Sequence, residues 1–544
     1  MSTTNSFFKY HPDGVSFTSN DAALFRQIYL PLSGTTSAGI KSCITPYLSG
    51  DIKIDKHAYL TKPVSREDLR YNVRDFFLNM NGKVCSLALE SEPNSAQVEI
   101  GQLYHKLIRS HKKAGVEMEV LNFVPVSGEN VEIMKVTVRN VSKKEITFTP
   151  TFALPVFGRS LANKHDHEHV TALLHRTKQT ANGILVEPTM NFKEEGHKVC
   201  HAVYFVAGQE GGGAKPAGSL PTAESFYGEK GNMSMPQAIV ENLKPKKLSD
   251  DEMQGKEVVG ALRFKEAKLK KGESKEYMLV FGLADNETNA MKAFEGFKTA
   301  KAVDAALIEC KKFWQKKTHA IEFKSGDAQF DSWMKWVALQ PVLRRIWGCS
   351  FLPDHDYGKG GKGWRDLWQD LLSLILIEPE LIRENLINNF MGVRIDGSNA
   401  TIIGTHPGEF IADRNAITRV WMDHGVWCLL TTLLYVHQTG DTDILFKEVS
   451  YFKDPQQSRT FEKDSHWTPS YGNRLKTRGG KIYQGSILEH LLVQHLVPFY
   501  NVGEHNLIRL ESADWNDGLD MAFKRGESAA FMAIYGGNLL ALAD

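Results

Sequence analysis

The stretch VEIMKVTVRNVSKKEITFTPTFALPVFG, residues 131–158, decides the fold of the first half of the chain. Apolar and polar side chains alternate between Ile133 and Val138, which is the period of two expected for a half-buried strand. A polar turn follows at residues 140–144, and the alternation resumes at Ile146. The stretch therefore predicts two antiparallel strands that pair with each other as a hairpin.

A second stretch with the same character lies at residues 256–283. EVVGALRF and KEYMLVFGLA each have strand composition, and the polar run KEAKLKKGES separates them. Hairpins repeated over more than two hundred residues are typical of a large antiparallel sandwich. We therefore predict that residues 1–285 form an N-terminal β-sandwich.

The composition changes near residue 286, where apolar residues begin to recur at the spacing of a helix. Residues 286–326 are predicted as a helical linker. From 327 onward long apolar helices alternate with glycine-containing loops, at residues 327–348 (interrupted by Pro341), 365–377, 417–441 (ended by Gly440) and 486–500. A β domain followed by paired helices favours a multidomain β plus α protein whose residues 327–544 form part of an (α/α)6 barrel. Because the chain stops inside an apolar helix, we expect it to be the N-terminal portion of a longer protein.

The overall composition excludes several classes of function. The chain has 544 residues, and 65 Lys and Arg face 64 Asp and Glu, which gives a net charge of +1. A balanced charge predicts no binding to nucleic acid or to an anionic membrane surface. No apolar stretch is long enough to span a bilayer, so a cytoplasmic location is expected. The 6 cysteines lie too far apart for a zinc site or a disulfide framework, and we predict reduced thiols, most of them buried.

A glycine-rich run precedes one of the predicted helices. Gly358, Gly360 and Gly363 fit the spacing G-x-G-x-x-G. A nucleotide site also requires a surrounding βαβ unit and an acidic residue after its second strand, and neither is predicted here. Trp364 occupies the position at which a phosphate-binding loop of the Walker type requires lysine. The run is interpreted as a loop at the mouth of a barrel.

The helix that follows this loop carries a polar stripe. In WRDLWQDLL, Arg365 and Gln369 lie four residues apart, and so do Asp366 and Asp370. Two carboxylates at this spacing repel each other unless a cation bridges them, and Arg365 is a structural candidate for that bridge. The alternative is a row of donors and acceptors that binds sugar hydroxyls.

The segment ESADWNDGLD, residues 511–520, concentrates acidic side chains in a predicted loop. A carboxylic acid next to Trp515 is partly removed from water, which suits it to be a general acid. A calcium loop is disfavoured, because the spaced ligands and the distal glutamate of an EF-hand are absent.

Other polar residues lie in HPGEF (406–410) and MDHGVW (422–427). A histidine on an apolar helix is more often a core residue than a catalyst, so His437 and His495 are predicted as core residues. The sequence contains neither a Gly-x-Ser-x-Gly elbow nor an HExxH motif, and a serine hydrolase or a zinc protease is not supported.

Several motifs together resemble glycoside hydrolase family 94, the inverting β-glucoside phosphorylases of the cellobiose and β-oligoglucan phosphorylase type. GWRDLWQDLL resembles the family's G-F-R-D-x-x-Q-D-L motif, and ADWNDGLD resembles A-D-W-N-D-x-L. Between and after them, in the family's order, stand DHGVWCLLTTLLYVHQTGD, ILEHLLVQHL, VGEHNLIRL and RGES. The resemblance implies a β-sandwich, a helical linker, an (α/α)6 barrel and a small C-terminal β domain.

The resemblance also implies roles for individual residues. Asp517 matches the catalytic general acid. The resemblance matches Arg365 and Asp370 to residues that hold the donor glucose and Trp515 to the stacking platform, and it aligns Arg419 and Asp423 with donor-side residues. The polar stripe adds Asp366 and Gln369 as candidate sugar-binding residues, and the acidic loop adds Asp514. The family's phosphate ligands lie mostly in a later segment, which is expected beyond Asp544, so residues 1–544 alone are expected to be inactive. Where cellobiose-type members carry Trp-Trp-His-Pro, this chain reads GSNATIIGTHPGEFIADRNAIT (397–418), so β-1,2, β-1,3 and β-1,4 linkages all stay open.

The implied activity is that of a glycosyltransferase (a hexosyltransferase) of carbohydrate metabolism, with inorganic phosphate as co-substrate and no metal or organic cofactor. Its partners would be a β-gluco-oligosaccharide and phosphate, without nucleic acid or membrane, and a homodimer is one candidate assembly. Two alternatives stay open. One is an inverting hydrolase whose base would be a second acid such as Glu409, and the other is a non-catalytic sugar-binding fragment.

Overall fold

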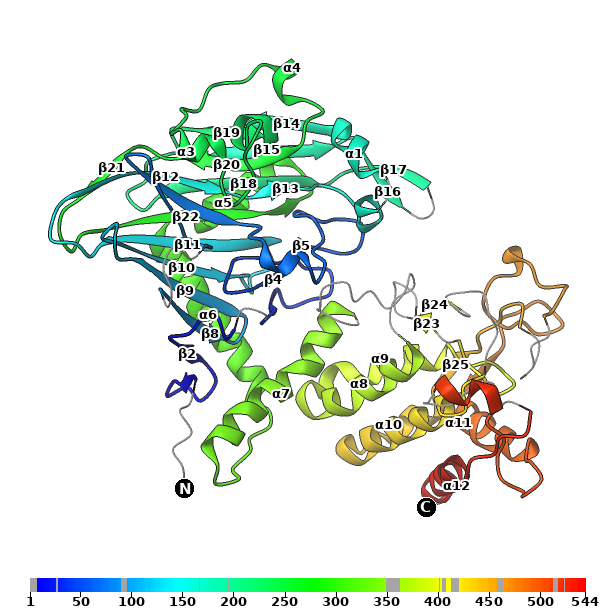
Figure 1. Ribbon diagram of the computed structural model, residues 1–544. Coiled ribbons are helices and arrows are strands. Elements are labelled where there is room, and N and C mark those ends of the chain that lie inside the picture. Colours follow the sequence, from blue (N-terminus) through cyan, green and yellow to red (C-terminus); the bar gives the residue numbers. More distant parts are fainter. Residues whose placement is uncertain are drawn as a thin grey trace. The chain divides into compact units, whose positions relative to one another are not determined.

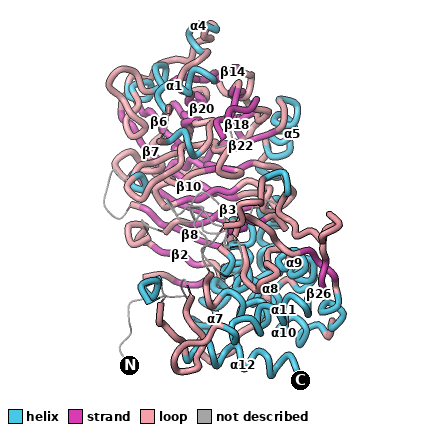
Figure 2. Tube along the Cα trace, turned by 90° about the vertical axis from the view of Figure 1, so that its right-hand side faces the viewer, coloured by secondary structure: helices cyan, strands magenta, loops and turns pink. Residues whose placement is uncertain are grey.

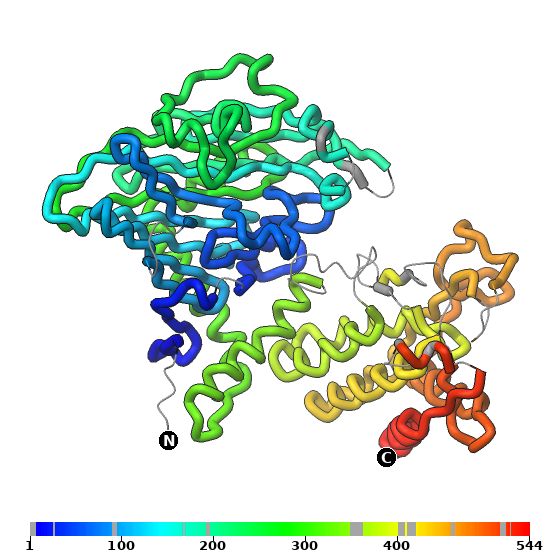
Figure 3. Tube along the Cα trace, viewed as in Figure 1, coloured from blue at the N-terminus to red at the C-terminus, as the bar shows by residue number. Residues whose placement is uncertain are grey.

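The computed structural model describes residues 7–544 except 26–27, 90–94, 166, 194–195, 349–362, 401, 404–407, 412–419, 457–458, 460–462, 512–516 and 523. The described residues divide into two compact units, one up to Trp336 and one from Val337 onward. Figure 3 follows the chain through both, with blue to green residues in the first and lime to red residues in the second. This division falls inside a helix, and the predicted boundaries at residues 285 and 326 remain predictions.

The first unit is a sandwich of two large antiparallel sheets, as predicted (Figure 1). Figure 2 shows several strands of the larger sheet following one another in order. The ten-stranded sheet has the order β1 (Lys9–Tyr10), β2 (Phe17–Ser19), β8 (Ala96–Gly101), β9 (Tyr104–His111), β10 (Val116–Phe123), β11 (Val131–Asn140), β22 (Ser274–Ala284), β18 (Val203–Glu210), β15 (Gly183–Pro188) and β14 (His175–Gln179). The seven-stranded sheet contains β13 (Pro155–Val156), β20 (Val258–Arg263), β12 (Ile146–Ala153), β6 (Asp75–Met80) and β7 (Lys83–Ser86), with β19 (Gly218–Thr222) and β21 (Ala267–Leu269) beside them.

Smaller elements complete this unit. They are a three-stranded sheet of β3 (Leu30–Ser33), β4 (Lys41–Ile44) and β5 (Ile52–Lys53), the pair β16 (Met190–Lys193) and β17 (Gly196–Val199), and the short helices α1 (Glu168–Thr171), α2 (Ala223–Phe226), α3 (Gln237–Val240) and α4 (Asp250–Met253).

Both predicted hairpins are wrong in their pairing, although the strands themselves are present. β11 bonds to β10 and β22 in the larger sheet, whereas β12 bonds to β6, β20 and β21 in the smaller one. β20 and β22 likewise belong to different sheets. The short connections therefore cross from sheet to sheet. Alternation shows which face of a strand is buried, but its hydrogen-bonding partners are set by contacts with strands distant in sequence.

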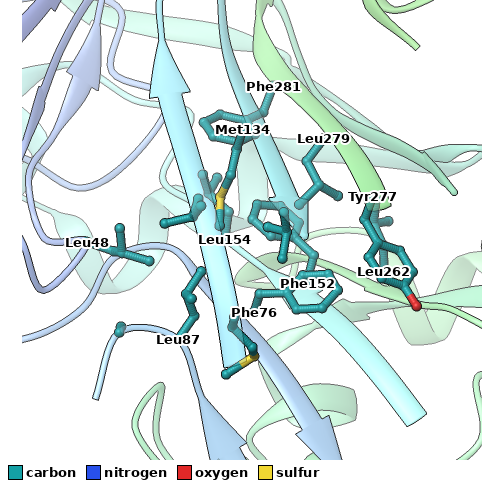
Figure 4. Packing of buried hydrophobic residues seen from close by; sticks show 14 of the residues in the cluster. Leu48, Phe76, Leu87, Met134, Phe152, Leu154, Leu262, Tyr277, Leu279 and Phe281 are labelled. Carbon is teal, nitrogen blue, oxygen red and sulfur yellow. The ribbon is translucent and has the colours of Figure 1, made fainter. Parts of the chain in front are cut away.

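The core lies between the two sheets. Met134, Val136 and Val138 of β11 are fully buried in it and lie on one face of that strand. Phe152 of β12 and Phe281 of β22 stack across the core with their ring centroids 5.6 Å apart (Figure 4). Full burial of one such side chain contributes about 1.5–3 kcal/mol, so the apolar layer is the main source of stability in this unit.

Two helices follow the last strand of the sandwich and pack against its larger sheet. α5 (Glu287–Phe297) contacts β22 and β18, and α6 (Ala300–Thr318) contacts β11 and β22. α6 buries Val303, Cys310 and Trp314, which repeat at helical spacing. Cys43, Cys85, Cys310 and Cys428 are buried free thiols, as predicted, whereas Cys200 is partly exposed and Cys349 lies outside the described residues.

Pro341 does not interrupt its helix, contrary to the prediction. α7 runs without a break over Ala328–Trp347 with Pro341 inside it. A proline lacks one N–H donor and usually kinks or ends a helix. Here the apolar side chains on either side, Leu339, Val342 and Leu343, are buried, and their packing maintains the helix across the missing hydrogen bond.

The second unit is built from helices, in agreement with the predicted class. It contains α8 (Trp364–Ile377), α9 (Ile382–Phe390), α10 (His424–Thr439), α11 (Ile487–Leu496) and α12 (Ala529–Ala543). α8 packs against α10 and α9, and α10 packs against α11 and α12 (Figure 1). α10 ends at Gly440 with φ 72°, the left-handed C-cap that its sequence predicts.

Two short strand pairs also occur in this unit, where the sequence predicted helices and loops only. They are β23 (Ile402–Ile403) with β24 (Phe410–Ile411), and β25 (Glu448–Ser450) with β26 (Gln484–Ser486). Across the described ranges, no helix has the length and apolar character needed to cross a membrane.

Candidate active site

α8 presents the predicted polar stripe. Most of its apolar side chains, including Trp364, Trp368 and Leu371, are buried, while Arg365 and Asp366 are partly exposed. Gly363 caps its N-terminus. The spacing of four residues places the polar side chains on one side of the helix, because 3.6 residues make one turn. The local sequence therefore sets the position of the stripe, whereas the residues that form ion pairs with it come from other segments.

Arg365 forms a two-point ion pair with Asp423, the residue just before α10. Its Nε lies 2.5 Å from Asp423 Oδ2, and its Nη2 lies 3.0 Å from Oδ1. The side chain of Asp423 is 1% exposed and that of Arg365 is 22% exposed. Burial by itself raises the pKa of Asp423, but the hydrogen bonds and charge of Arg365 and the hydrogen bond from Trp427 outweigh it and lower the pKa overall. Asp423 is thus a buried carboxylate that orients the guanidinium.

Aromatic groups surround this ion pair. Trp427 Nε1 donates to Asp423 Oδ2 at 3.1 Å. The guanidinium of Arg365 lies 5.7 Å from the centre of the Trp421 ring, which itself stacks on His424. Burial lowers the pKa of His424 to about 4, so this imidazole is neutral at pH 7. The arrangement supplies a rigid, partly apolar wall beside an arginine, as many sugar sites do.

Asp366 and Asp370 are bridged by Arg344 of α7, whereas the sequence suggested Arg365 for this role. Arg344 Nε donates to Asp370 Oδ1 at 2.8 Å, and its Nη2 lies 3.4 Å from Asp366 Oδ1. Arg344 was missed because nothing in its local sequence distinguishes it from the neighbouring Arg345. The repeated arginines near a helix C-terminus were the only signal available.

The acidic loop begins beside the Arg365–Asp423 pair. Glu511 forms a backbone β-bridge with Trp421, two residues before Asp423. Its own backbone is left-handed, with φ 54°. Arg459 donates two hydrogen bonds to its carboxylate, from Nε to Oε1 at 3.0 Å and from Nη2 to Oε2 at 2.6 Å. Asn501 Nδ2 also donates to Oε1, at 3.0 Å. The start of the loop is therefore fixed next to the residues that hold Arg365.

We expect Arg459→Gln to destabilise the helical unit by about 2–3 kcal/mol. The change leaves the Glu511 carboxylate, whose side chain is 6% exposed, without its cation. Thermal unfolding measured by circular dichroism tests this. Arg525→Gln is the control, because its pair with Glu504 is largely exposed and is worth at most about 0.5 kcal/mol. Equal melting temperatures for both variants would show that the Arg459–Glu511 pair contributes nothing.

Other predicted site residues are only partly described. Arg419, Asp514 and Trp515 lie outside the described residues, as do His406 and most of the glycine-rich run. Asp517 begins the short 3₁₀ turn Asp517–Ala522, but the position of its side chain is not among those described. Gln369 is partly buried on α8, and Glu409 is exposed. The structure thus places Arg365, Asp366, Gln369 and Asp370 on α8 and Asp423 at the N-terminal cap of α10, and these two helices contact each other.

The histidines behave differently from one another. His495 is a satisfied core residue, as predicted, because its Nδ1 donates to Leu491 O at 2.8 Å and Asn538 Nδ2 donates to its Nε2 at 3.0 Å. His437 is exposed, so its predicted burial is wrong. It lies in the last turn of α10. Within the described part of the chain, no three His, Cys, Asp or Glu side chains are grouped to hold a metal ion.

Comparison with known families and proteins agrees with this architecture. Residues 77–300 match the supersandwich domain of glycosyl hydrolase family 94, and residues 313–479 match the catalytic domain of the glycosyl hydrolase 94 superfamily. The fold is thus that of a carbohydrate-active enzyme that joins a β-sandwich to a helical catalytic domain. The chain belongs to glycoside hydrolase family 94.

The curated relatives have low sequence identity to this chain, and phosphorylases are among them. The chain is 21% identical over 461 residues to N,N'-diacetylchitobiose phosphorylase of Vibrio proteolyticus, covering 80% of this chain and 51% of the relative. It is 23% identical over 309 residues to solabiose phosphorylase of Paenibacillus borealis, covering 56% and 33%. It is 23% identical over 321 residues to the cyclic beta-(1,2)-glucan synthase NdvB of Rhizobium meliloti strain 1021, covering 58% and 10%. The matched residues therefore span about half or less of each of these relatives.

Proposed function

We propose that this chain carries the sandwich and the donor-sugar half of the active site of an inverting phosphorylase that acts on β-linked gluco-oligosaccharides. The observation that carries the proposal is that direct contacts connect the polar stripe of α8 to the start of the acidic loop. Arg365 of α8 is held by Asp423 before α10, and the segment before Asp423 is bridged through Trp421 to Glu511, where the acidic loop begins. Family membership and the phosphorylases among the curated relatives support the reaction type.

The charges around α8 suit a neutral, hydroxyl-rich ligand. Two arginines, Arg344 and Arg365, face the three aspartates Asp366, Asp370 and Asp423. Their charges largely cancel, and the atoms that remain reachable are donors and acceptors at fixed positions. Paired hydrogen bonds from carboxylates and guanidinium groups orient sugar hydroxyls well. In this proposal Arg365, Asp366, Gln369 and Asp370 hold the donor glucose.

The chemistry requires one protein acid. Asp517 would protonate the glycosidic oxygen while inorganic phosphate attacks C1 from the opposite face of the ring. The C1–O bond breaks, and the products are α-glucose 1-phosphate and an oligosaccharide shorter by one sugar. An inverting hydrolase needs a second carboxylate to activate water, whereas phosphate is already an anionic nucleophile. Trp515 would stack on the sugar, Asp514 would orient the loop, and Arg419 would lie on the donor side.

The deciding experiment measures products with and without phosphate. The protein in its full-length form is incubated with β-1,2-, β-1,3- and β-1,4-linked glucose disaccharides, and glucose 1-phosphate and glucose are quantified separately. We expect glucose 1-phosphate to form only when phosphate is present. Release of glucose at the same rate without phosphate would favour a hydrolase, with Glu409 as the candidate base. Sugar binding without turnover would favour a non-catalytic sugar-binding portion.

Among the three linkages, two observations favour β-1,2. The relative from Rhizobium meliloti is a cyclic beta-(1,2)-glucan synthase. The segment 397–418 of this chain also lacks the tryptophans that cellobiose-type members carry. We therefore propose the β-1,2-linked disaccharide as the first substrate to test.

A further inference from the structure

Two adjacent arginines near the end of α7 form ion pairs with different carboxylates. One contacts aspartates on α8, and the other contacts a glutamate in the turn after α8. Arg344 reaches the polar stripe, with Nε 2.8 Å from Asp370 Oδ1 and Nη2 3.4 Å from Asp366 Oδ1. Arg345 reaches past the end of α8, where its Nε and Nη2 lie 2.8 and 3.2 Å from the two carboxylate oxygens of Glu378. One arginine thus contacts residues of the proposed sugar site, and its neighbour does not.

Arg344 lies on a part of α7 whose apolar side chains are buried. Leu339, Val342, Leu343 and Ile346 of α7 are all at most 1% exposed, so this part of the helix is fixed in the core of its unit. A guanidinium on such a helix presents its donors in a fixed plane, and planar donors set the orientation of the carboxylates that they bind. Without it, Asp366 and Asp370 would face each other on successive turns of α8 as like charges, a destabilising arrangement.

We infer that Arg344 is a positioning residue for the donor-sugar site. It holds Asp366 and Asp370 in the orientation in which their carboxylates accept hydroxyl hydrogen bonds from the sugar. The inference rests on the proposed function, since it assigns a part in sugar binding to a residue that acts through those two aspartates. Arg345 has a structural role only, because Glu378, with a side chain 1% exposed, belongs to the turn after α8.

The pair of arginines provides a matched test. Arg344→Gln and Arg345→Gln remove the same charge from neighbouring positions, and both variants lose an ion pair to a carboxylate. Affinity for the disaccharide that the wild type binds best is measured by titration calorimetry, beside the melting temperature. We expect Arg344→Gln to weaken the affinity by about 10–100-fold. Arg345→Gln should lower the melting temperature and leave the affinity within about twofold of the wild type.

Two further variants keep the test valid if Arg344→Gln does not fold. They also separate the orienting effect of the Arg344 guanidinium from the effect of its charge. Arg344→Lys keeps the charge but not the planar fork, so it should fold and still bind less tightly than the wild type. In the double variant Arg344→Gln with Asp370→Asn, the second change should cost less than about threefold beyond the first, because residues that act as a unit are not additive.

The outcomes separate the two proposals. A wild-type protein that binds none of the disaccharides overturns the proposed function. A wild type that binds sugar, together with Arg344→Gln and Arg344→Lys variants of unchanged affinity, overturns the role of Arg344 and leaves the proposed function standing. Fully additive losses in the double variant would also overturn it, because they would show that Arg344 does not act through Asp370.

Discussion

In the full-length enzyme, Asp517→Asn is expected to reduce the rate of phosphorolysis by about 10²–10⁴-fold while sugar binding survives. Asparagine keeps the size of the side chain and removes the proton that the leaving oxygen needs. The fold around this position should tolerate the change, since Leu519 of the same turn packs against the apolar cluster that contains Met422, Ile508 and Tyr535. The measurement is the initial rate on the best disaccharide at saturating phosphate, with sugar affinity determined in parallel.

Asp514→Asn is the control for this experiment. Asp514 lies three residues earlier in the same acidic loop and is assigned to orienting it, so a smaller loss is expected. A reduction of less than about tenfold for Asp517→Asn would remove it from the role of general acid. An equal loss of affinity and rate would instead indicate that Asp517 binds the sugar.

Arg365→Ala is expected to weaken both sugar binding and the stability of the helical unit. The variant leaves Asp423, whose side chain is 1% exposed, as a buried carboxylate without its cation, which costs about 3 kcal/mol. The loss of the guanidinium should also weaken sugar affinity by at least about tenfold. Calorimetric titration and thermal unfolding of the same preparation measure the two effects.

The double variant Arg365→Ala with Asp423→Asn separates these effects. Removing the charge of Asp423 should restore most of the lost stability and none of the lost affinity. If the double variant binds sugar as well as the wild type, Arg365 has no direct contact with the ligand.

The stability deficit of Arg365→Ala should depend on pH. In the wild type the pKa of Asp423 is lowered, so its contribution to stability is present above the pKa of the unfolded chain and is lost as the pH falls through the folded value. In the variant, burial dominates and raises the pKa of Asp423, so the variant is relatively favoured at low pH. We therefore expect the difference in melting temperature between the two proteins to shrink between pH 7 and pH 4. A constant difference would show that Asp423 is not the source of the deficit.

The candidate site could be predicted from sequence wherever its residues share one helix or one short loop. The stripe of Arg365, Asp366, Gln369 and Asp370 follows from the periodicity of WRDLWQDLL alone, because a helix places residues four apart on the same face. The end of α10 at Gly440 has an equally local cause. Partners contributed by other segments could not be predicted from local patterns. Arg344 contacts Asp370 from 26 residues away, and Arg459 contacts Glu511 from 52 residues away.

By itself the sequence determined the alternating strands of the sandwich, the helices of the second half and the polar stripe along α8, because each depends on contacts within a few residues. Only the tertiary structure decided that β11 and β12 belong to opposite sheets, that α7 continues through Pro341, and that Asp423 holds Arg365 while Arg344 bridges the two aspartates. These outcomes depend on which distant segments compete to bury the same apolar surface and to satisfy the same buried charges. That competition is resolved only when the whole chain packs, since the free energy of each pairing includes the partners that it displaces.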